Sequence, residues 1–418
     1  MPATTEEVET VSSQGRAPFF KNPWWVVVGA VVGLIVGSGA VVAFTFSLFL
    51  RPMAAEFGWT RSQVSTGLTA FQLLAAIGTP FAGKLADIWG ARRATFFFVA
   101  SFGVFVAALS LLPPQRIPFL LLYAAAGLAS AGQAPPPYAR AIASWFEENR
   151  GLALGIGALG VGFGTTLMPQ VARVFLSHYG WRGAYVGLGL VTFAVGFLAV
   201  GLWVFERPRP VVAGKVSALP EGLTLREASK KSAFWYLTLT MFLASCVTNG
   251  FVAHVGAMVS DRGESVKFAA FLLTLAGLMM IVGKLVAGFL LDRMHPPYVS
   301  AVLFLVAFPG LLIFNAGTST TFPIAGIVFV GISLGAMVPV ENYLAATYFG
   351  LRQYGTIAGY FMGCLLLGAS FGPWLMGYSF DHNHSYHVAL MEFCGALIVC
   401  AISVAQMGPP VFASMKRK

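Results

Sequence analysis

The sequence predicts an all-α membrane protein with twelve transmembrane helices in two pseudo-symmetric bundles of six. Its composition is the first reason, because 57% of the 418 residues are hydrophobic, 10% are charged and the mean hydropathy is +0.77. Soluble domains carry about 25% charged residues, and a soluble fold could not bury this much apolar surface. The second reason is the number of long apolar segments, and the third is a repeat between the halves of the chain.

A helix that crosses the hydrocarbon core of a bilayer needs about 20 apolar residues. Twelve segments meet this requirement, at about 23–50, 62–82, 94–112, 118–143, 151–176, 183–205, 233–258, 267–291, 298–316, 322–346, 355–379 and 387–407. A long polar stretch separates the sixth segment from the seventh. We therefore expect a polar tail over 1–22, a first bundle over 23–205, a linker over 206–232, a second bundle over 233–407 and a basic tail over 408–418.

The distribution of lysine and arginine predicts the orientation, because these residues gather in cytoplasmic loops. If both termini are cytoplasmic, eighteen of the 26 basic residues lie inside, seven lie outside and Lys284 lies within the membrane. We expect a multi-pass protein of an inner or plasma membrane, with no nucleic-acid partner despite the net charge of +10. The amino-terminal residues lack the basic-then-apolar order of a cleaved signal peptide.

The two halves repeat a pattern of small and acidic residues. The triplet Gly78, Gly83 and Asp87 recurs 205 residues later as Gly283, Gly288 and Asp292. Two related six-helix halves are the architecture of transporters that hold their cargo midway between the halves and expose it to each side in turn.

Two motifs at matching positions of the halves carry a resemblance to a known family. They are GKLADIWGARR, over 83–93, and its degenerate copy GFLLDR, over 288–293. With them the chain resembles the major facilitator superfamily over essentially its whole length. The resemblance implies a cytoplasmic gate that opens and closes between the bundles. Its residues would be Gly83, Asp87, Gly90, Arg92, Arg93, Asp292 and Arg293.

Other segments resemble the monocarboxylate transporters and their bacterial relatives, which include oxalate–formate antiporters. These segments are EFGWTRSQVS from Glu56, WFEENRGLALG from Trp145, YFGLRQYG from Tyr348 and GASFGPWLMGYSFD from Gly368. In that subfamily a cation eight residues before the loop aspartate of the eighth span binds the carboxylate of the substrate. Lys284 stands eight residues before Asp292, so the resemblance implies that Lys284 binds a carboxylate.

Lys284 also stands out on physical grounds. A lysine at the centre of a membrane helix costs about 2.5–3.5 kcal/mol on insertion scales. The alternative is a side chain that reaches the cytoplasmic interface. However, Leu291, seven residues on and near the end of the helix, lies about 10 Å further along, which is more than a lysine side chain comfortably covers.

Two residues of the family site are replaced in this sequence. Met280 stands where proton-coupled relatives carry an aspartate, and Phe361 stands where oxalate–formate antiporters carry a second cation. One cation suits a monoanion, because a second carboxylate would remain buried and unpaired.

Other polar residues in the spans are further candidates. The predicted substrate-binding set is Lys284, Tyr123, Asn249, His254, Tyr360 and Asn342. The predicted proton carriers are Lys284, His254 and Glu341. Each has an alternative interpretation: packing for the tyrosines, helix–helix hydrogen bonding for the asparagines, an interfacial bond to a backbone carbonyl for His254, and an ion pair with an arginine such as Arg140 for Glu341.

The sequence carries none of the common hydrolase or nucleotide-binding signatures, so we expect neither an enzyme nor a cofactor. The histidine-rich stretch DHNHSYH, over 381–387, is interpreted as a polar loop and not as a metal site. The predicted function is secondary active transport of small monocarboxylates, such as lactate or pyruvate, by proton-coupled symport with alternating access. Antiport of organic anions, a receptor-like protein that has lost transport, and a neutral or aromatic cargo beside an uncharged Lys284 remain alternatives. No obligatory protein partner is implied.

Overall fold

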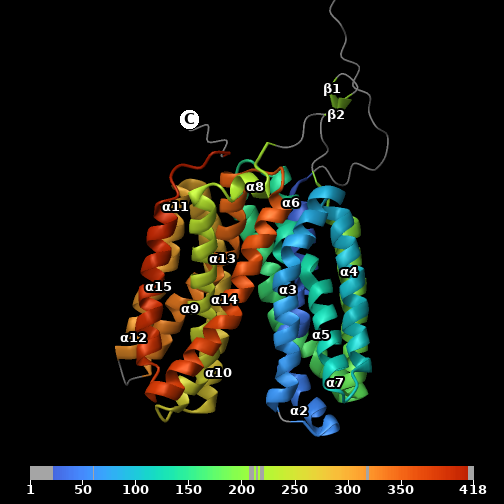
Figure 1. Cartoon of the computed structure of the whole chain (residues 1–418), viewed down its shortest axis with the longest axis vertical. Helices are drawn as coiled ribbons and strands as arrows, with labels where there is room; N and C mark the ends of the chain where they lie inside the picture. The colour runs from blue at the N-terminus through green and yellow to red at the C-terminus, as the bar shows by residue number, and fades with distance from the viewer. Residues whose placement is uncertain are drawn as a thin grey trace, which may run out of the picture.

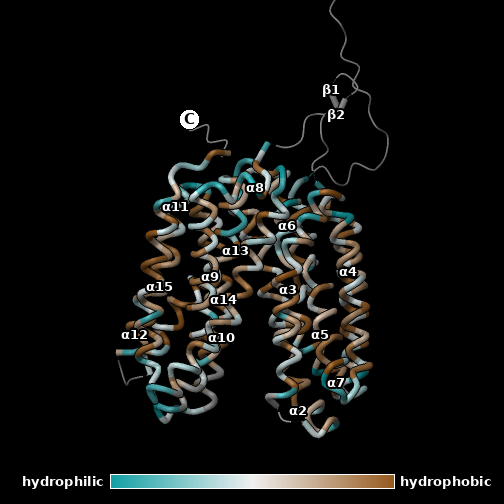
Figure 2. The backbone as a smooth tube through the Cα atoms, in the orientation of Figure 1, coloured by the Kyte–Doolittle hydropathy of each residue, from teal (hydrophilic) through white to brown (hydrophobic). Residues whose placement is uncertain are grey.

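The computed structural model describes residues 22–59, 61–206, 211–212, 215–216, 221–316 and 320–412. Nearly all of the predicted amino-terminal tail, part of the linker and residues 413–418 of the basic tail lie outside the described residues. The fold is almost entirely helical, and two bundles of long helices stand side by side (Figure 1). Figure 2 shows apolar residues along the flanks of both bundles and polar residues at their two ends.

The helices of the first bundle come from the first half of the chain. They are α1 (Trp24–Ile35), the π-helical turn η2 (Gly39–Ala43), α2 (Phe46–Phe57), α3 (Arg61–Trp89), α4 (Ala91–Ala108), η3 (Leu109–Leu111), α5 (Arg116–Ser130), η4 (Ala131–Gln133), α6 (Pro135–Trp145) and α7 (Arg150–Trp203). The linker contains a two-stranded antiparallel ribbon, β1 (Val211–Val212) and β2 (Lys215–Val216), and the short helix α8 (Leu225–Ala228).

The second bundle comes from the second half of the chain. Its helices are α9 (Ser232–Ser260), α10 (Val266–Arg293), α11 (Pro296–Leu305), α12 (Ala307–Ala316), α13 (Thr321–Phe349), α14 (Tyr354–Asn383) and α15 (His387–Ala405). Consecutive short helices such as α11 and α12 together form one apolar span, Pro296–Ala316.

Eleven helical segments of the described residues are long and apolar enough to cross a membrane. One of them, α7, has 54 residues, about 80 Å if it were straight, whereas a bilayer core is about 30 Å thick. It turns at Gly180, whose φ of 65° and ψ of −178° are not helical and suit a residue without a Cβ. The two parts of α7 correspond to the fifth and sixth segments expected from the sequence, which explains why twelve segments appear as eleven.

Two other crossings are interrupted near the middle of their length. The first span changes to a π-helical turn at Gly39, and the fourth ends at Ser130 and resumes at Pro135. The three prolines that begin α6 occupy its first turn, where a missing N–H leaves no helical bond unmade. The two interruptions touch, because a Cβ added to Gly37 would lie 3.2 Å from the carbonyl oxygen of Gln133.

The bundles meet closely at the end of the molecule that carries α8 and the start of α11, which we call the linker end (Figure 1). Here α3 packs on α14 with Gly83 against Gly355, and α7 packs on α10 with Gly151 against Gly288. An added Cβ at any of these positions would collide with backbone across the interface. Away from the linker end the bundles diverge in Figure 1, so this conformation is closed at the linker end.

At the opposite end of the first bundle, Glu56 of α2 connects this helix to α7 close to its turn at Gly180. Its carboxylate accepts hydrogen bonds from Arg182 Nη2, at 2.8 Å, and from Trp181 Nε1, at 2.5 Å. These two bonds hold the pKa of Glu56 below its usual value. Arg182 also donates to the carbonyl oxygens of Ser110 and Leu112, so one ion pair fastens three segments of the first bundle.

We predict that Glu56→Gln lowers the melting temperature of the purified protein at pH 7. The pKa of Glu56 is lower in the folded protein than in the unfolded chain. Its contribution to the free energy of unfolding is therefore complete above the unfolded pKa of about 4.3 and is lost as the pH falls through the folded pKa. The half-exposed pair is worth about 1 kcal/mol or less. Thermal unfolding at pH 7 and near pH 3 checks this, and an unchanged difference between variant and wild type across that range would contradict it.

Candidate functional site

Lys284 lies on α10 where this helix packs against α7 of the other bundle. Only 2% of the residue is exposed. A Cβ added to Gly155 would lie 2.7 Å from the backbone oxygen of Lys284, and one added to Gly162 would lie 4.0 Å from its Nζ. The ammonium nitrogen has no hydrogen-bond partner among the described residues. The sequence-predicted cation is therefore at the interface of the bundles, with Gly155 against its backbone and Gly162 near its Nζ.

Glu341 on α13 is a second buried ionisable group without a partner. It is fully buried, and neither carboxyl oxygen makes a hydrogen bond to any described residue. The alternative pairing with Arg140 is wrong, because Arg140 forms ion pairs with Asp87 and Glu206 instead. These acids hold Arg140 on α6 of the first bundle, so Arg140 does not neutralise the carboxyl group of Glu341.

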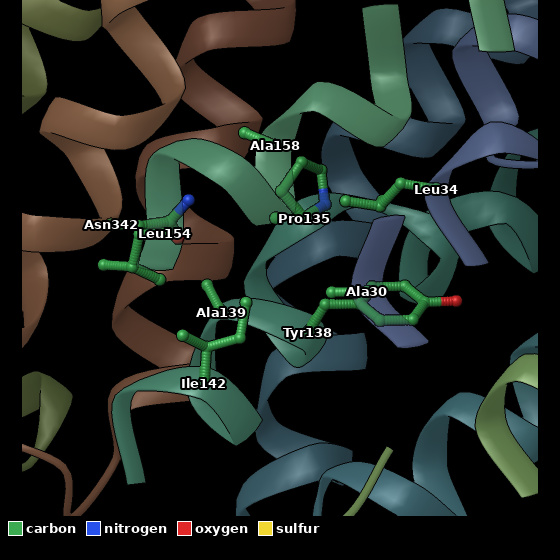
Figure 3. A pocket seen from close by; sticks show the side chains of 10 residues that line it. Ala30, Leu34, Pro135, Tyr138, Ala139, Ile142, Leu154, Ala158 and Asn342 are labelled. Atoms are coloured by element: carbon green, nitrogen blue, oxygen red, sulfur yellow. The ribbon is translucent and has the colours of Figure 1, made fainter. Parts of the chain in front are cut away.

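The neighbouring Asn342 is engaged within its own bundle. Its Nδ2 donates to the carbonyl oxygen of Val338 at 3.0 Å, and its Oδ1 accepts from the hydroxyl of Tyr354 at 2.9 Å. Asn342 also lines a small cavity that is otherwise surrounded by residues of the first bundle (Figure 3). That cavity measures about 10 Å³, about the room that one water molecule needs, so a carboxylic acid does not fit there in this conformation.

Three other candidates lie in the second bundle and have local partners. Asn249 donates to the carbonyl oxygen of Ser245 at 3.0 Å. His254 has one ring nitrogen 3.0 Å from the carbonyl oxygen of Pro373 and the other 3.3 Å from the hydroxyl of Tyr386. The ring of Tyr360 packs on that of Phe234, with centroids 5.0 Å apart. The geometry of His254 fits the interfacial alternative, a histidine that bonds a backbone carbonyl.

In this conformation Tyr123 lies away from the interface between the bundles. The residue is fully buried inside the first bundle, and its hydroxyl lies 2.8 Å from that of Tyr185. Its ring packs against Phe46 and Phe119. An aromatic residue in a span is satisfied by such packing, and we leave Tyr123 out of the proposed site.

Asp87 forms the first contact of the predicted gate. It accepts hydrogen bonds from the backbone nitrogens of Gly355 and Thr356, at 2.9 and 2.8 Å, and from the hydroxyl of Thr356 at 2.6 Å. These groups begin α14, so a carboxylate of one bundle caps a helix of the other, where the helix dipole favours negative charge. Arg140 forms ion pairs with both Asp87 and Glu206 and so fixes the Asp87 carboxylate within the first bundle.

Asp292 repeats this contact in the other direction. It accepts from the backbone nitrogens of Gly151 and Leu152, at 2.7 and 2.8 Å, at the start of α7. The position that corresponds to Arg140, 203 residues later, is Tyr343. In the described part of the second bundle Asp292 forms no ion pair. The two contacts therefore share their hydrogen-bond geometry, but an arginine pairs with the carboxylate of Asp87 and not with that of Asp292.

The remaining gate candidates play smaller parts in this conformation. Arg92 donates to the carbonyl oxygen of Gly201 at 2.5 Å, within its own bundle, and Gly90 has a φ of 83° that permits the turn before α4. Arg293 lies over the ring of Phe289, 3.5 Å from its centroid. Arg93 is exposed at the linker end. Of the predicted gate, Gly83, Asp87 and Asp292 make the contacts between the bundles.

Sequence reasoning did not identify Glu206 or the glycines beside Lys284 as parts of these contacts. Glu206 lies in a Pro- and Arg-rich stretch that reads as a linker, yet it bonds Arg140 and accepts from the backbone nitrogen of Ala91 at 3.3 Å. The glycines at 151 and 155 on α7 are four residues apart, a spacing that puts small residues on one helix face. That pattern was visible in the sequence and marks the face toward α10.

Comparisons with known proteins agree with this architecture. A sequence model of the Major Facilitator Superfamily matches residues 30–373. The chain is 26% identical to Monocarboxylate transporter 13 of Bos taurus, over 93% of this chain and 90% of that protein. It is 24% identical to the Gallate transporter of Pseudomonas putida, over 79% of this chain and 80% of that protein. The solved human organic anion transporter MFSD10 (TETRAN) has the same fold, with a TM-score of 0.71 at 16% identity over 93% of this chain and all of that one.

We predict that Asp87→Ala opens the linker end. The variant loses bonds to the start of α14 and leaves Arg140 with one acid, and bonds to charged groups are worth about 1.5–3 kcal/mol each, so the closed state should become less populated by at least about tenfold. Spin labels at positions 89 and 352, in a protein without its native cysteines, measure the separation. Asp261→Ala, an exposed acid, is the control, and an unchanged distance distribution in Asp87→Ala would contradict the prediction.

Proposed function

The chain belongs to the major facilitator superfamily, and we propose that it is a secondary active transporter of small monocarboxylates. The observation that carries this proposal is Lys284, a buried amine at the interface of the bundles with no partner among the described residues. A charge left unpaired in such a place costs several kcal/mol. An anion that binds there removes that penalty, so the interface favours a cargo with a negative group.

The number of cations limits the charge of the cargo. Within the described part of the chain, Lys284 is the buried basic residue without a partner, whereas Arg140 is occupied by two acids. A dianion would bring one carboxylate that nothing neutralises. A monocarboxylate therefore fits best. The named relatives carry monocarboxylates and gallate, so we extend the cargo class from lactate- and pyruvate-like acids to aromatic monocarboxylic acids.

The transport mechanism depends on the packing of α7 over Lys284. Lys284 lies on α10, which also carries Asp292 and packs on α7 through Gly151, Gly155 and Gly162. When the bundles rock, α7 and α10 separate at one end and approach at the other, and Lys284 becomes accessible to each side in turn. Neutralisation of Lys284 by the carboxylate makes closure around it less unfavourable, so the loaded site closes more readily than the empty one.

We assign proton coupling to Glu341. A permanent carboxylate at this depth would require a cation or several donors, and Glu341 has neither among the described residues. A group that takes up and releases a proton during the cycle does not need such a partner. His254 is less suited, because its ring already bonds Tyr386 and Pro373. Symport of one acid with one proton is the cycle we propose, and exchange of one anion for another is the alternative.

We predict that Lys284→Ala abolishes uptake, lowering it by about 100-fold or more, because the carboxylate would then be buried without a cation, at about 3–5 kcal/mol. Lys284→Arg should keep part of the activity, since it preserves the charge. The assay uses proteoliposomes that contain a pH dye, with lactate, pyruvate or an aromatic acid added outside. Lys230→Ala, an exposed lysine, is the control.

The outcomes of this assay separate the alternatives. Uptake by Lys284→Ala at the wild-type rate would contradict the assignment of the site. Exchange of labelled acid by the wild type without a proton signal would indicate antiport. Binding of an acid without any movement would indicate a receptor. Inactivity of Lys284→Arg beside an active wild type would indicate that the amine itself must lose its proton.

We predict that Glu341→Gln loses proton-coupled uptake but keeps the exchange of labelled acid across the membrane, because the cation that binds the acid remains. The same liposomes test both activities, first with a pH dye and then with labelled acid on the two sides. Glu392→Gln, an exposed carboxyl on α15, provides a matched control. A wild-type proton signal in Glu341→Gln would remove Glu341 from the mechanism.

A further inference from the structure

The outer face of the first bundle carries a long apolar groove that the transport mechanism does not use. It lies between α3, α4 and α5 and has a volume of about 750 Å³. Its walls are mainly aromatic and aliphatic, and Phe81 is 67% exposed, Phe97 52% and Leu128 48%. Apolar side chains this exposed on a transmembrane bundle face the hydrocarbon of the bilayer.

The groove lies on the side of α3 that faces away from the second bundle. Thr79 and Gly83 of α3 contact Gly359 and Gly355 of α14, whereas their neighbours in sequence, Gly78, Phe81 and Lys84, line the groove. Successive positions on a helix point in different directions, so the groove and the interface occupy two faces of one helix. A molecule in the groove is therefore not cargo on its way between the bundles.

Two exposed cations lie on the parts of α3 and α4 that are nearer the linker end, one in the groove lining and one beside it. Lys84 is the charged residue in its lining. Arg93 is exposed and stands four residues before Phe97, so both lie on one face of α4. Neither forms an ion pair within the described residues, and the nearby acids Asp87 and Glu206 are engaged by Arg140.

Trp89 marks the depth of this charged end. The residue is 46% exposed, and its ring packs on that of Phe97, with centroids 6.0 Å apart. Tryptophan favours the boundary between hydrocarbon and headgroups. The groove therefore runs from the headgroup level, where Lys84 lines it and Arg93 lies beside it, into the hydrocarbon, where its walls are apolar.

We infer that this groove binds one phospholipid with an anionic headgroup, with an acyl chain along Phe81, Phe97 and Leu128 and the headgroup phosphate near Lys84 and Arg93. The charges select the occupant, because a zwitterionic lipid has an ammonium group that Lys84 and Arg93 would repel. If the linker end is cytoplasmic, as the distribution of basic residues predicts, this end also faces the leaflet that is richer in anionic lipids.

The test is lipid binding to the purified full-length protein, measured by native mass spectrometry. Phosphatidylglycerol and phosphatidylcholine with identical acyl chains are titrated into separate samples and into a mixture. We expect the first bound lipid to be phosphatidylglycerol. The double variant Lys84→Ala/Arg93→Ala should lose this preference by roughly fivefold for each basic residue, which corresponds to about 1 kcal/mol.

Two further variants make the result specific. Ser101→Trp places a large side chain in the groove lining and should weaken the first binding event for both lipids. Lys230→Ala/Lys231→Ala removes the same charge from exposed residues of the linker end outside the groove and should leave the preference unchanged. Helical content and a monodisperse elution profile confirm that each variant is folded.

The inference is overturned if the wild type binds both lipids equally, or if Lys84→Ala/Arg93→Ala keeps the full preference. It is also overturned if the Lys230→Ala/Lys231→Ala control loses as much preference as the groove variant, because general surface charge would then explain binding. A first binding event that Ser101→Trp does not weaken would place the lipid outside the groove. None of these readouts depends on which solute the protein transports.

Discussion

The closed linker end depends on two carboxylates that each cap a helix of the opposite bundle. Asp87 holds the start of α14 and Asp292 holds the start of α7. In each case the carboxylate satisfies backbone N–H groups that a helix leaves unpaired at its first turn and interacts favourably with the helix dipole. These bonds form only if the backbones approach closely, which is why Gly83, Gly151, Gly288 and Gly355 lie at the contacts.

The same interface accounts for the position of Lys284. The helix pair α7 and α10 that is closed by Asp292 continues toward the membrane centre past Gly155 and Gly162, where the amine is buried. Because α10 carries both residues, two turns apart, a movement that breaks the capping bonds also changes the exposure of Lys284. The second unpaired group, Glu341, lies on α13 of the same bundle. Binding charge and coupling charge would thus both belong to the second half of the chain.

Much of this arrangement was predictable from the sequence. Apolar segment lengths predict the spans, and the repeat of Gly83 and Asp87 at Gly288 and Asp292 predicts paired contacts between the halves. Lys284 was predictable because a lysine within an apolar helix has few structural reasons to be there. The hydrogen-bond and ion-pair partners of the side chains were not predictable from the sequence. Whether Tyr123 faces a cavity or Tyr185, and whether Arg140 meets Glu341 or Asp87, depends on helix rotation and packing that hydropathy does not encode.

The central claim is that Lys284 recognises the negative charge of the cargo, and a binding titration tests it most directly. Calorimetry on the purified protein would compare a carboxylic acid with its uncharged amide, for example lactate with lactamide, in the wild type and in Lys284→Met, which keeps a long side chain without the charge. The account predicts that the wild type binds the acid far more tightly than the amide and that Lys284→Met loses this difference. Equal binding of acid and amide by the wild type, or an undiminished preference for the acid in Lys284→Met, would contradict it.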